Sequence, residues 1–258
     1  INRIVERTIE KAVPTPAGSV KETTVVVKED DLITDSIAKN AKSIVRIKRL
    51  VTLDSGDSAE KVIGIGILLT KEGLFATDAG ILESGVSYSA VASDGSVFSV
   101  KITSLGASYS TALGTLIAAE ATKNYVFVPA TLGDPKSLKL GQTMLALSGA
   151  TRQNVSTGIV DSLITAEAET ATSTANKQIA FISTNIPGGS LLPGSPLINI
   201  FGEVVGISTL DSRRKDASVF TPSVVISAQV QARQKTTDAA GGATSSASQS
   251  AAVGNSSQ

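Results

Sequence analysis

Histidine and cysteine are both absent from the 258-residue sequence. Without an imidazole the chain cannot build a Ser-His-Asp or Cys-His relay, and it cannot hold a metal ion through histidine. Without cysteine, disulfides and thiol chemistry are excluded as well, although this absence does not indicate a cellular compartment. We therefore expect neither a metal nor a cofactor, and any catalysis would have to proceed without imidazole and thiol.

Surplus charge, aromatic residues and long apolar runs are also lacking. Lys+Arg and Asp+Glu each number 23, so the formal net charge is zero and we expect no nucleic-acid partner. No apolar run approaches the roughly 18–20 residues of a membrane span, so membrane contact would need an anchor upstream of this sequence. Aromatic residues make up only 3%, and the many small and β-branched residues favour numerous short strands.

The first 13 residues predict an amphipathic or coiled-coil-like helix. They place Ile1, Val5, Thr8 and Ala12 at helical spacing, with Ile4 and Ile9 nearby and charged residues in the gaps. A helix of this length is marginal in isolation, so a partner would be needed to hold it.

Residues 14–30 predict a proline linker followed by an exchangeable strand. Two prolines interrupt the helical pattern, and Val25, Val26 and Val27 then stand together between charged residues. A lone strand must pair with a sheet edge, either of its own chain or of a neighbour. We name the apolar residues of both N-terminal segments as candidate assembly contacts: Ile4, Val5, Ile9, Val25, Val26 and Val27.

The main domain is predicted to be all-β. Acidic residues open a predicted helix over 30–43, and about eleven short strands follow as far as residue 210 with no helices between them. This pattern indicates Greek-key barrels or a sandwich. A terminal helix is predicted over 220–234, with Pro222 in its first turn, and residues 236–258 form a low-complexity tail.

Three short motifs resemble parts of ligand-binding sites, but their sequence context does not support a ligand. The glycines of 64–68 lack the remaining spacing of a nucleotide loop, and the acidic stretch 28–31 lacks the spacing of a calcium loop. The basic stretch 212–215 is flanked by Asp211 and Asp216, so we interpret it as a solvated hairpin loop.

From about residue 43 to residue 235 the chain resembles the protease domain of HtrA/Deg-type trypsin-like serine proteases. The motifs that carry the resemblance are, in family order, "KVIGIGILLTKEGLFATDAGIL", "ASDGSVFSVKI", "GASYSTALGTLIA", "LGDPKSLKLGQTMLALSGA", "STGIVDSL" and "TNIPGGSLLPGSPLINIFGEVVGIST". The resemblance implies a double Greek-key β-barrel followed by a C-terminal helix. We assign residues 31–235 to the protease-like domain, which adds the helix that precedes the first strand, and we expect the boundary between the two barrels near 125–140.

The same resemblance places Gly80 at the position of the catalytic histidine, Ala112 at the aspartate and Pro193 at the nucleophile. None of these side chains can attack, take a proton or orient a base, and proline also lacks the backbone N–H of an oxyanion hole. Ser195 is interpreted as a turn serine. Ser190 has no lysine in its loop to activate it.

Asp78 stands next to the lost histidine position and is interpreted as a loop or capping residue. We therefore predict a protease fold without protease chemistry.

Two functions remain open from the sequence. The first is an exported, extracellular or cell-surface structural subunit that assembles into a filament or layer through its terminal arms, as a homo-oligomer or polymer. The second is a peptide-binding or regulatory pseudoprotease that captures an extended peptide without cutting it.

Overall fold

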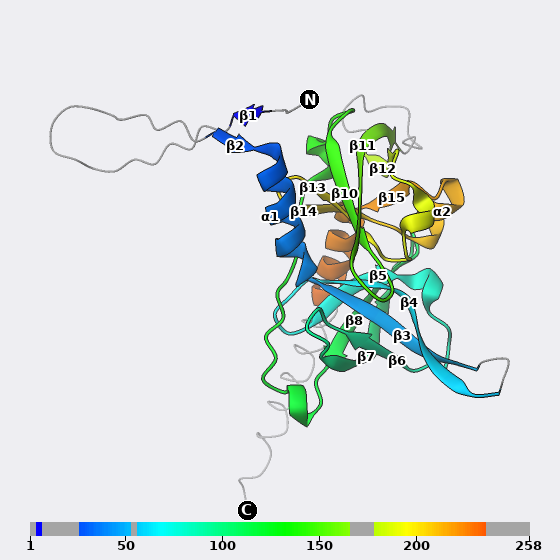
Figure 1. The fold of residues 1–258 in the computed structure, drawn as a ribbon. Helices are drawn as coiled ribbons and strands as arrows, with labels where there is room; N and C mark the ends of the chain where they lie inside the picture. Colours follow the sequence, from blue (N-terminus) through cyan, green and yellow to red (C-terminus); the bar gives the residue numbers. More distant parts are fainter. Residues whose placement is uncertain (1–3, 7–25, 53–55, 166–177, 236–258) are drawn as a thin grey trace, which may run out of the picture.

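The computed structural model describes residues 4–6, 26–52, 56–165 and 178–235. Within them, two β-barrels stand one above the other, with helices α1 and α2 on either side of the second barrel (Figure 1). This arrangement confirms the predicted all-β, trypsin-like double barrel.

The first barrel is a closed ring of six strands in the order β3-β4-β5-β8-β7-β6. Its strands are β3 (Ile44–Thr52), β4 (Ser58–Leu68), β5 (Leu74–Asp78), β6 (Tyr88–Val91), β7 (Val97–Leu105) and β8 (Thr111–Ile117). Alternating residues such as Val45 and Ile47 of β3 point into an apolar core that also contains Phe75 and Phe98. The period-2 alternation of short strands thus builds the barrel as expected.

The second barrel closes because β13 and β14 pair with each other as well as with the rest of the sheet. Its strands are β10 (Thr143–Ser148), β11 (Asn154–Thr165), β12 (Ile179–Thr184), β13 (Pro196–Asn199), β14 (Glu203–Ile207) and β15 (Val219–Pro222), with β9 (Thr131–Leu132) added in parallel to β14. Met144, Ile182, Leu197 and Phe220 fill its interior.

The connection between the barrels packs onto the first of them. It contains the short helix η2 (Glu120–Thr122), after which Tyr125 and Phe127 stack against Phe98 with ring centroids 5.0 and 4.9 Å away. Burial in this aromatic group raises the pKa of Tyr125 above its ordinary value. The connection is therefore anchored by side-chain packing before β9 begins.

A third apolar cluster joins the two barrels. Leu113 of β8, Leu145 and Leu147 of β10 and Ile207 of β14 meet there. Two helices cover this cluster: α1 (Glu29–Ala41) contributes Ile33 and Ile37, and the helical residues 223–235 contribute Ile226 and Val230. The terminal helix thus exists, although Pro222 is the last residue of β15 and not part of the first turn.

The predicted helix over 1–13 is wrong at Ile4–Glu6. These residues form strand β1, which pairs antiparallel with β2 (Val26–Lys28), so that Val5 lies opposite Val27. β-Branched residues satisfy strand geometry at least as well as helical geometry, and pairing supplies the backbone bonds that an isolated short helix lacks. Ile9 and Val25 lie outside the described residues.

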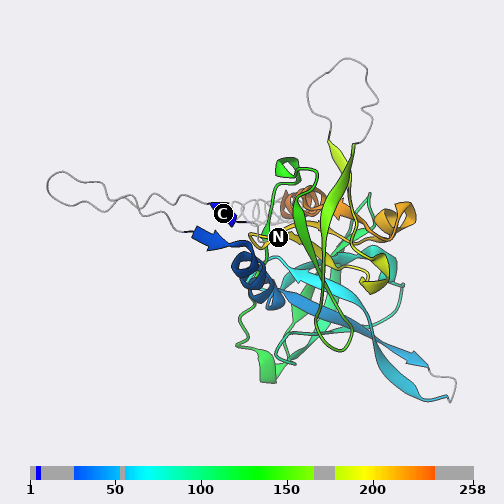
Figure 2. The same ribbon diagram turned by 45° about the horizontal axis from the view of Figure 1, so that its top comes forward.

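The pair β1–β2 forms a sheet of its own and joins neither barrel. β2 leads directly into α1, whose far end is fixed to the second barrel. Asn40 donates there from Nδ2 to the carbonyl of Gly202 at 3.0 Å, so the N-terminal strands extend from a firmly held helix (Figure 2).

Candidate functional site at the barrel junction

The structure places the three residues predicted to stand at triad positions where the barrels meet. Gly80 lies in the short helix η1 (Ala79–Ile81) directly after β5, and Ala112 of β8 is fully buried opposite Thr77 of β5. Pro193 lies in the loop between η4 (Gly188–Ser190) and β13. Its carbonyl accepts a 2.8 Å hydrogen bond from the N–H of Ile65 in β4, which ties this loop to the first barrel.

Close packing excludes a larger side chain at the histidine position. A Cβ placed on Gly80 would lie 2.7 Å from Cβ of Leu210 and 3.1 Å from Oδ1 of Asp78. Real Cβ contacts are longer than the first of these distances, so an imidazole could enter only if Leu210 moved away. A side chain at this position would therefore require a shift of Leu210.

Asp78 is the centre of a polar network between the two barrels. Its carboxylate is fully buried, and Oδ2 accepts from Nη2 of Arg213 at 2.7 Å. The other oxygen, Oδ1, accepts from the N–H of Gly80 at 2.9 Å and from the N–H of Leu210 at 3.0 Å. A buried carboxylate is tolerated only when it is paired and hydrogen-bonded, and both conditions are met here.

The predicted capping role of Asp78 is confirmed, because it is the N-cap of η1. The predicted solvated loop at 212–215 is wrong. These residues belong to helix α2 (Leu210–Lys215), which Thr209 and Ser212 cap reciprocally. The helix turns Arg213 inward to Asp78, a partner 135 positions away that local charge balance could not indicate.

Ser195 lies in a turn, as its sequence context predicts. It is fully buried, its Oγ accepts from the N–H of Leu192 at 3.2 Å, and its own N–H donates to the Leu192 carbonyl at 3.0 Å. Ser190 donates to the carbonyl of Pro187 at 2.7 Å and shares a 2.8 Å hydrogen bond with Ser156. In these hydrogen bonds neither hydroxyl meets a basic side chain that could take its proton.

The chain segment 208–210, beside the Pro193 loop, has its backbone groups engaged. The carbonyl of Ser208 accepts from the N–H of Gly194 at 2.7 Å, and the N–H of Ser208 donates to the carbonyl of Ser195 at 2.9 Å. The next two N–H groups donate to Ser212 Oγ and Asp78 Oδ1, each at 3.0 Å. An extended peptide could not pair with this segment unless it first displaced these bonds.

No group of three or more acidic side chains gathers among the described residues in a way that would hold a metal ion. Within the same residues, no helix combines the length and apolarity needed to cross a membrane.

Comparison with known proteins agrees with this fold. The sequence profile of the trypsin-like peptidase domain matches residues 64–207, more than half of the chain. The chain belongs to the trypsin-like peptidase domain family. The matched range begins in β4, ends with β14 and contains all three triad positions.

Two curated relatives bear the description serine protease Do-like HtrA. The protein from Bacillus subtilis (strain 168) is 25% identical over 172 residues, which cover 63% of this chain and 36% of the relative. The one from Lactobacillus helveticus is 26% identical over 153 residues, covering 57% and 35% respectively. The chain therefore spans only about a third of the length of these relatives.

Proposed function

We propose that this protein is a non-catalytic member of its family that acts as an exported structural subunit. In this proposal it sits at the cell surface or outside the cell and assembles with copies of itself through its N-terminal strands. The observation that carries the proposal is the sheet β1–β2, which stands outside both barrels and is attached to α1.

A two-stranded sheet is marginally stable alone and leaves unpaired backbone groups along its outer edges. Strands from another copy could satisfy these groups through main-chain hydrogen bonds, which supply affinity without demanding a particular side-chain sequence. The helix that follows β2 is held by Asn40 and by the hydrogen bond from Thr143 Oγ1 to Glu29 at 3.0 Å. A fixed helix gives the projecting strands a defined direction.

The absence of catalysis is supported by what fills the barrel junction. Gly80, Ala112 and Pro193 supply no catalytic side chain, and Leu210 with the Asp78–Arg213 pair occupies the surrounding space. The alternative function, capture of an extended peptide, receives less support because segment 208–210 has its N–H groups bonded internally. We therefore favour assembly.

Electron microscopy of the negatively stained full chain, beside a chain that begins at Glu29, tests the assembly. We expect regular filaments or sheets from the full chain and dispersed particles from the shortened one, which retains α1 and both barrels. Removal of residues 236–258 in a separate variant measures the contribution of the tail. Dispersed particles from the full chain over a range of concentrations would overturn the proposal.

The absence of catalysis needs a separate test. The full chain is incubated with a fluorescently labelled unfolded protein and with a fluorophosphonate probe that labels activated serines, beside an active trypsin-like protease. We expect no cleavage and no labelling. Labelling that disappears in Ser190→Ala or Ser195→Ala would show that one of these hydroxyls is activated after all.

A further inference from the structure

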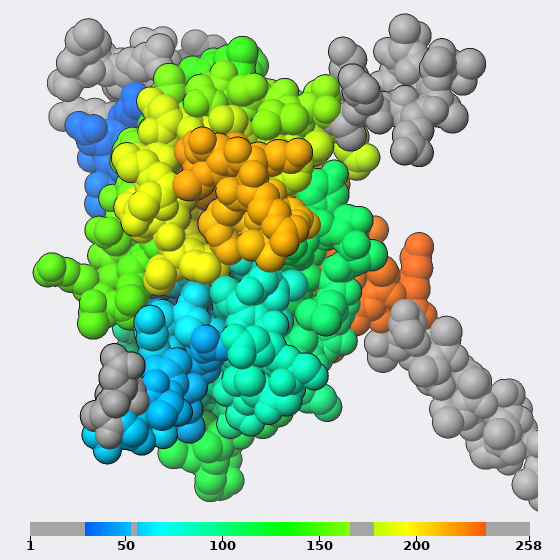
Figure 3. All heavy atoms as spheres, turned by 90° about the vertical axis from the view of Figure 1, so that its right-hand side faces the viewer, coloured from blue at the N-terminus to red at the C-terminus, as the bar shows by residue number. Residues whose placement is uncertain are grey.

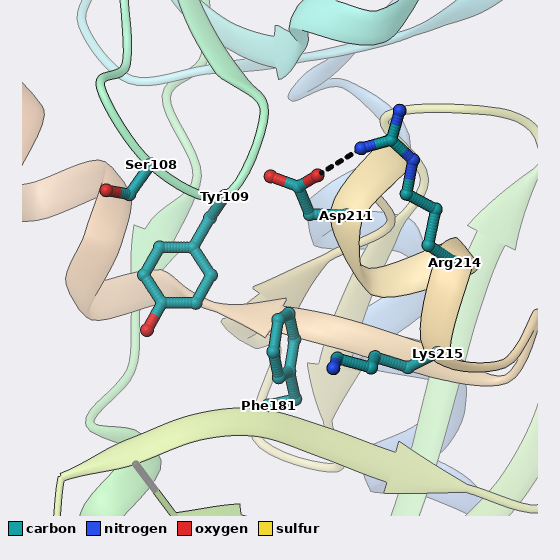
Figure 4. Close-up of a pocket in the computed structure, with 6 residues that line it drawn as sticks. All are labelled: Ser108, Tyr109, Phe181, Asp211, Arg214 and Lys215. Carbon is teal, nitrogen blue, oxygen red and sulfur yellow. Dashed lines mark hydrogen bonds and ion pairs between the residues drawn. The ribbon is translucent and has the colours of Figure 1, made fainter. Parts of the chain in front are cut away.

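A surface pocket of about 480 Å³ lies between the two barrels on the side of α2. Its walls come from the β7–β8 loop, from β12 and from α2 (Figure 4), and the lining residues are Ser108, Tyr109, Phe181, Asp211, Arg214 and Lys215. Figure 3 looks onto this side of the molecule, where α2 is exposed in orange above the strands of the first barrel.

The aromatic wall of the pocket is held by a constrained loop. Tyr109 and Ser110 both have left-handed backbone angles, with φ of 65° and 50°, which are unfavourable for residues other than glycine. Two 2.7 Å backbone hydrogen bonds hold the end of the loop: the N–H of Ala79 donates to the carbonyl of Ser110, and the N–H of Gly106 donates to the carbonyl of Thr111. The loop presents the ring of Tyr109 edge-on to Phe181, with centroids 5.3 Å apart, and both rings remain half-exposed.

The rim of the pocket carries the cations Arg214 and Lys215 and the carboxylate of Asp211. Arg214 is 68% exposed in its side chain and pairs with Asp211 at 3.3 Å, while Lys215 is exposed and takes part in none of the ion pairs found among the described residues. Asp216, the residue after Lys215, accepts hydrogen bonds from the hydroxyl and the N–H of Ser218. These bonds lower the pKa of its carboxyl below the ordinary value. The lining carries two positive charges and one negative charge, and the negative Asp216 lies next to it in the sequence.

The opposite side of the molecule carries acidic residues that could pair with these two cations. α1 lies at the left of the barrels and α2 at the right in Figures 1 and 2. The first turn of α1 contains Glu29, Asp30 and Asp31, the one run of three acidic residues in the whole sequence. Residues 213–215 of α2 are likewise the one run of three basic residues.

Asp30 and Asp31 are exposed, and no ion pair among the described residues involves either of them. With acidic residues on one face and exposed cations on the other, each copy can contact one neighbour through its first face and a second neighbour through its other face. Such a contact is heterologous, and it continues into a fibre unless its rotation closes a ring.

We propose that the first turn of α1 in one copy docks into the α2 pocket of the next copy. Asp30 and Asp31 approach Arg214 and Lys215, and the half-buried Leu32 faces the aromatic wall. Because β2 ends where α1 begins, this contact also brings β1–β2 to the neighbouring copy. The inference rests on the proposed assembly and names the two faces that carry it.

Charge reversal tests the contact in the full chain. One variant carries Asp30→Lys with Asp31→Lys, and a second carries Arg214→Glu with Lys215→Glu. A control with the same charge change as the first, Glu120→Lys with Asp161→Lys, alters exposed acids outside both faces. Each protein is sedimented and imaged at low and high salt, and thermal unfolding verifies that it is folded.

We expect at least a tenfold loss of sedimented protein for each reversal variant alone and no loss for the control. An equimolar mixture of the two variants should assemble again, because each then offers the charge that the other lacks. Assembly of the unmixed variants at the level of the unaltered chain would overturn this inference and leave the proposed function standing. Losses without recovery in the mixture would also overturn it, since the pocket would then have another occupant. Failure of the unaltered chain to assemble would overturn both.

Discussion

At the scale of single residues, the most consequential feature is the ion pair between Asp78 and Arg213. Asp78 is fully buried and Arg213 is 23% exposed in its side chain, so the pair is protected from water on most sides. Removal of one partner from such a pair leaves a charge without compensation, which typically costs about 3–5 kcal/mol. The stability of the junction between the two barrels therefore depends on an ion pair between distant parts of the sequence.

We predict that Arg213→Met lowers the free energy of unfolding by roughly 3–5 kcal/mol, because it leaves the Asp78 carboxylate buried and unpaired. Asp78→Asn combined with Arg213→Met should be more stable than Arg213→Met alone, since the amide oxygen can still accept from Gly80 and Leu210 without a charge. Urea unfolding of the four proteins of this double-mutant cycle measures the difference. Equal stability of the single Arg213 variant and the double variant would contradict the buried-charge explanation.

A second residue-scale prediction concerns restoration of the triad. Gly80→His, Ala112→Asp and Pro193→Ser together should give no hydrolysis of an unfolded protein substrate, because the imidazole meets Leu210 and the new carboxylate is placed at a fully buried position. Addition of Leu210→Gly, which removes the Cβ that a side chain at position 80 would meet, is the matched control for the steric part of this argument. Measurable hydrolysis by the triple variant without that addition would show that the junction accommodates a base.

At the scale of elements, α1 links the projecting strands to the body of the protein. Its apolar side packs into the cluster between the barrels, and Asn40 at its last turn is 2% exposed and donates to both Ser36 and Gly202. This attachment determines whether a force that acts on β1–β2 is transmitted to the barrels or only detaches the helix from them.

We predict that Asn40→Ala weakens this attachment by about 1–3 kcal/mol, because the buried carbonyl of Gly202 loses its donor. Amide hydrogen exchange in residues 29–41 should become faster, while exchange in β10 and β13 stays nearly unchanged. Lys39→Ala, an exposed change in the same turn, is the control and should leave exchange in the helix as it is. Unaltered exchange in Asn40→Ala would mean that apolar packing alone holds α1.

Elements were predictable from the sequence where periodicity was strong and partners were local. The alternation in β3 and the acidic start of α1 identified those elements correctly. Ile4–Glu6 was predicted as helix because its β-branched residues fit both periods, and only its pairing with β2 decides for a strand. Helix α2 and the Asp78–Arg213 pair escaped prediction, since a basic run has the same local pattern whether it faces water or a buried acid 135 positions away.

At the scale of the whole molecule, the two barrels share one apolar interface. Leu113 of the first barrel and Leu145 and Ile207 of the second are all fully buried in the cluster that also receives α1 and the terminal helix. If either barrel unfolds, the apolar side chains that the other barrel contributes to this cluster become exposed to water. The free energies of unfolding of the two barrels are therefore coupled.

We predict that the two barrels unfold in one transition and that Leu113→Ala destabilises both of them. Truncation of a buried leucine typically costs about 2–5 kcal/mol. Because Tyr109 contacts Phe181 of the second barrel, the measurement is made in a Tyr109→Phe background. Tyrosine fluorescence then follows the first barrel, since Tyr88 and Tyr125 pack in or against its core, whereas far-ultraviolet circular dichroism follows the strands of both barrels. The two urea transitions should coincide in this background and shift together when Leu113→Ala is added. A fluorescence transition that moves to lower urea while the circular dichroism separates into two steps would show that the interface does not couple the barrels, and each barrel would then unfold as a separate unit.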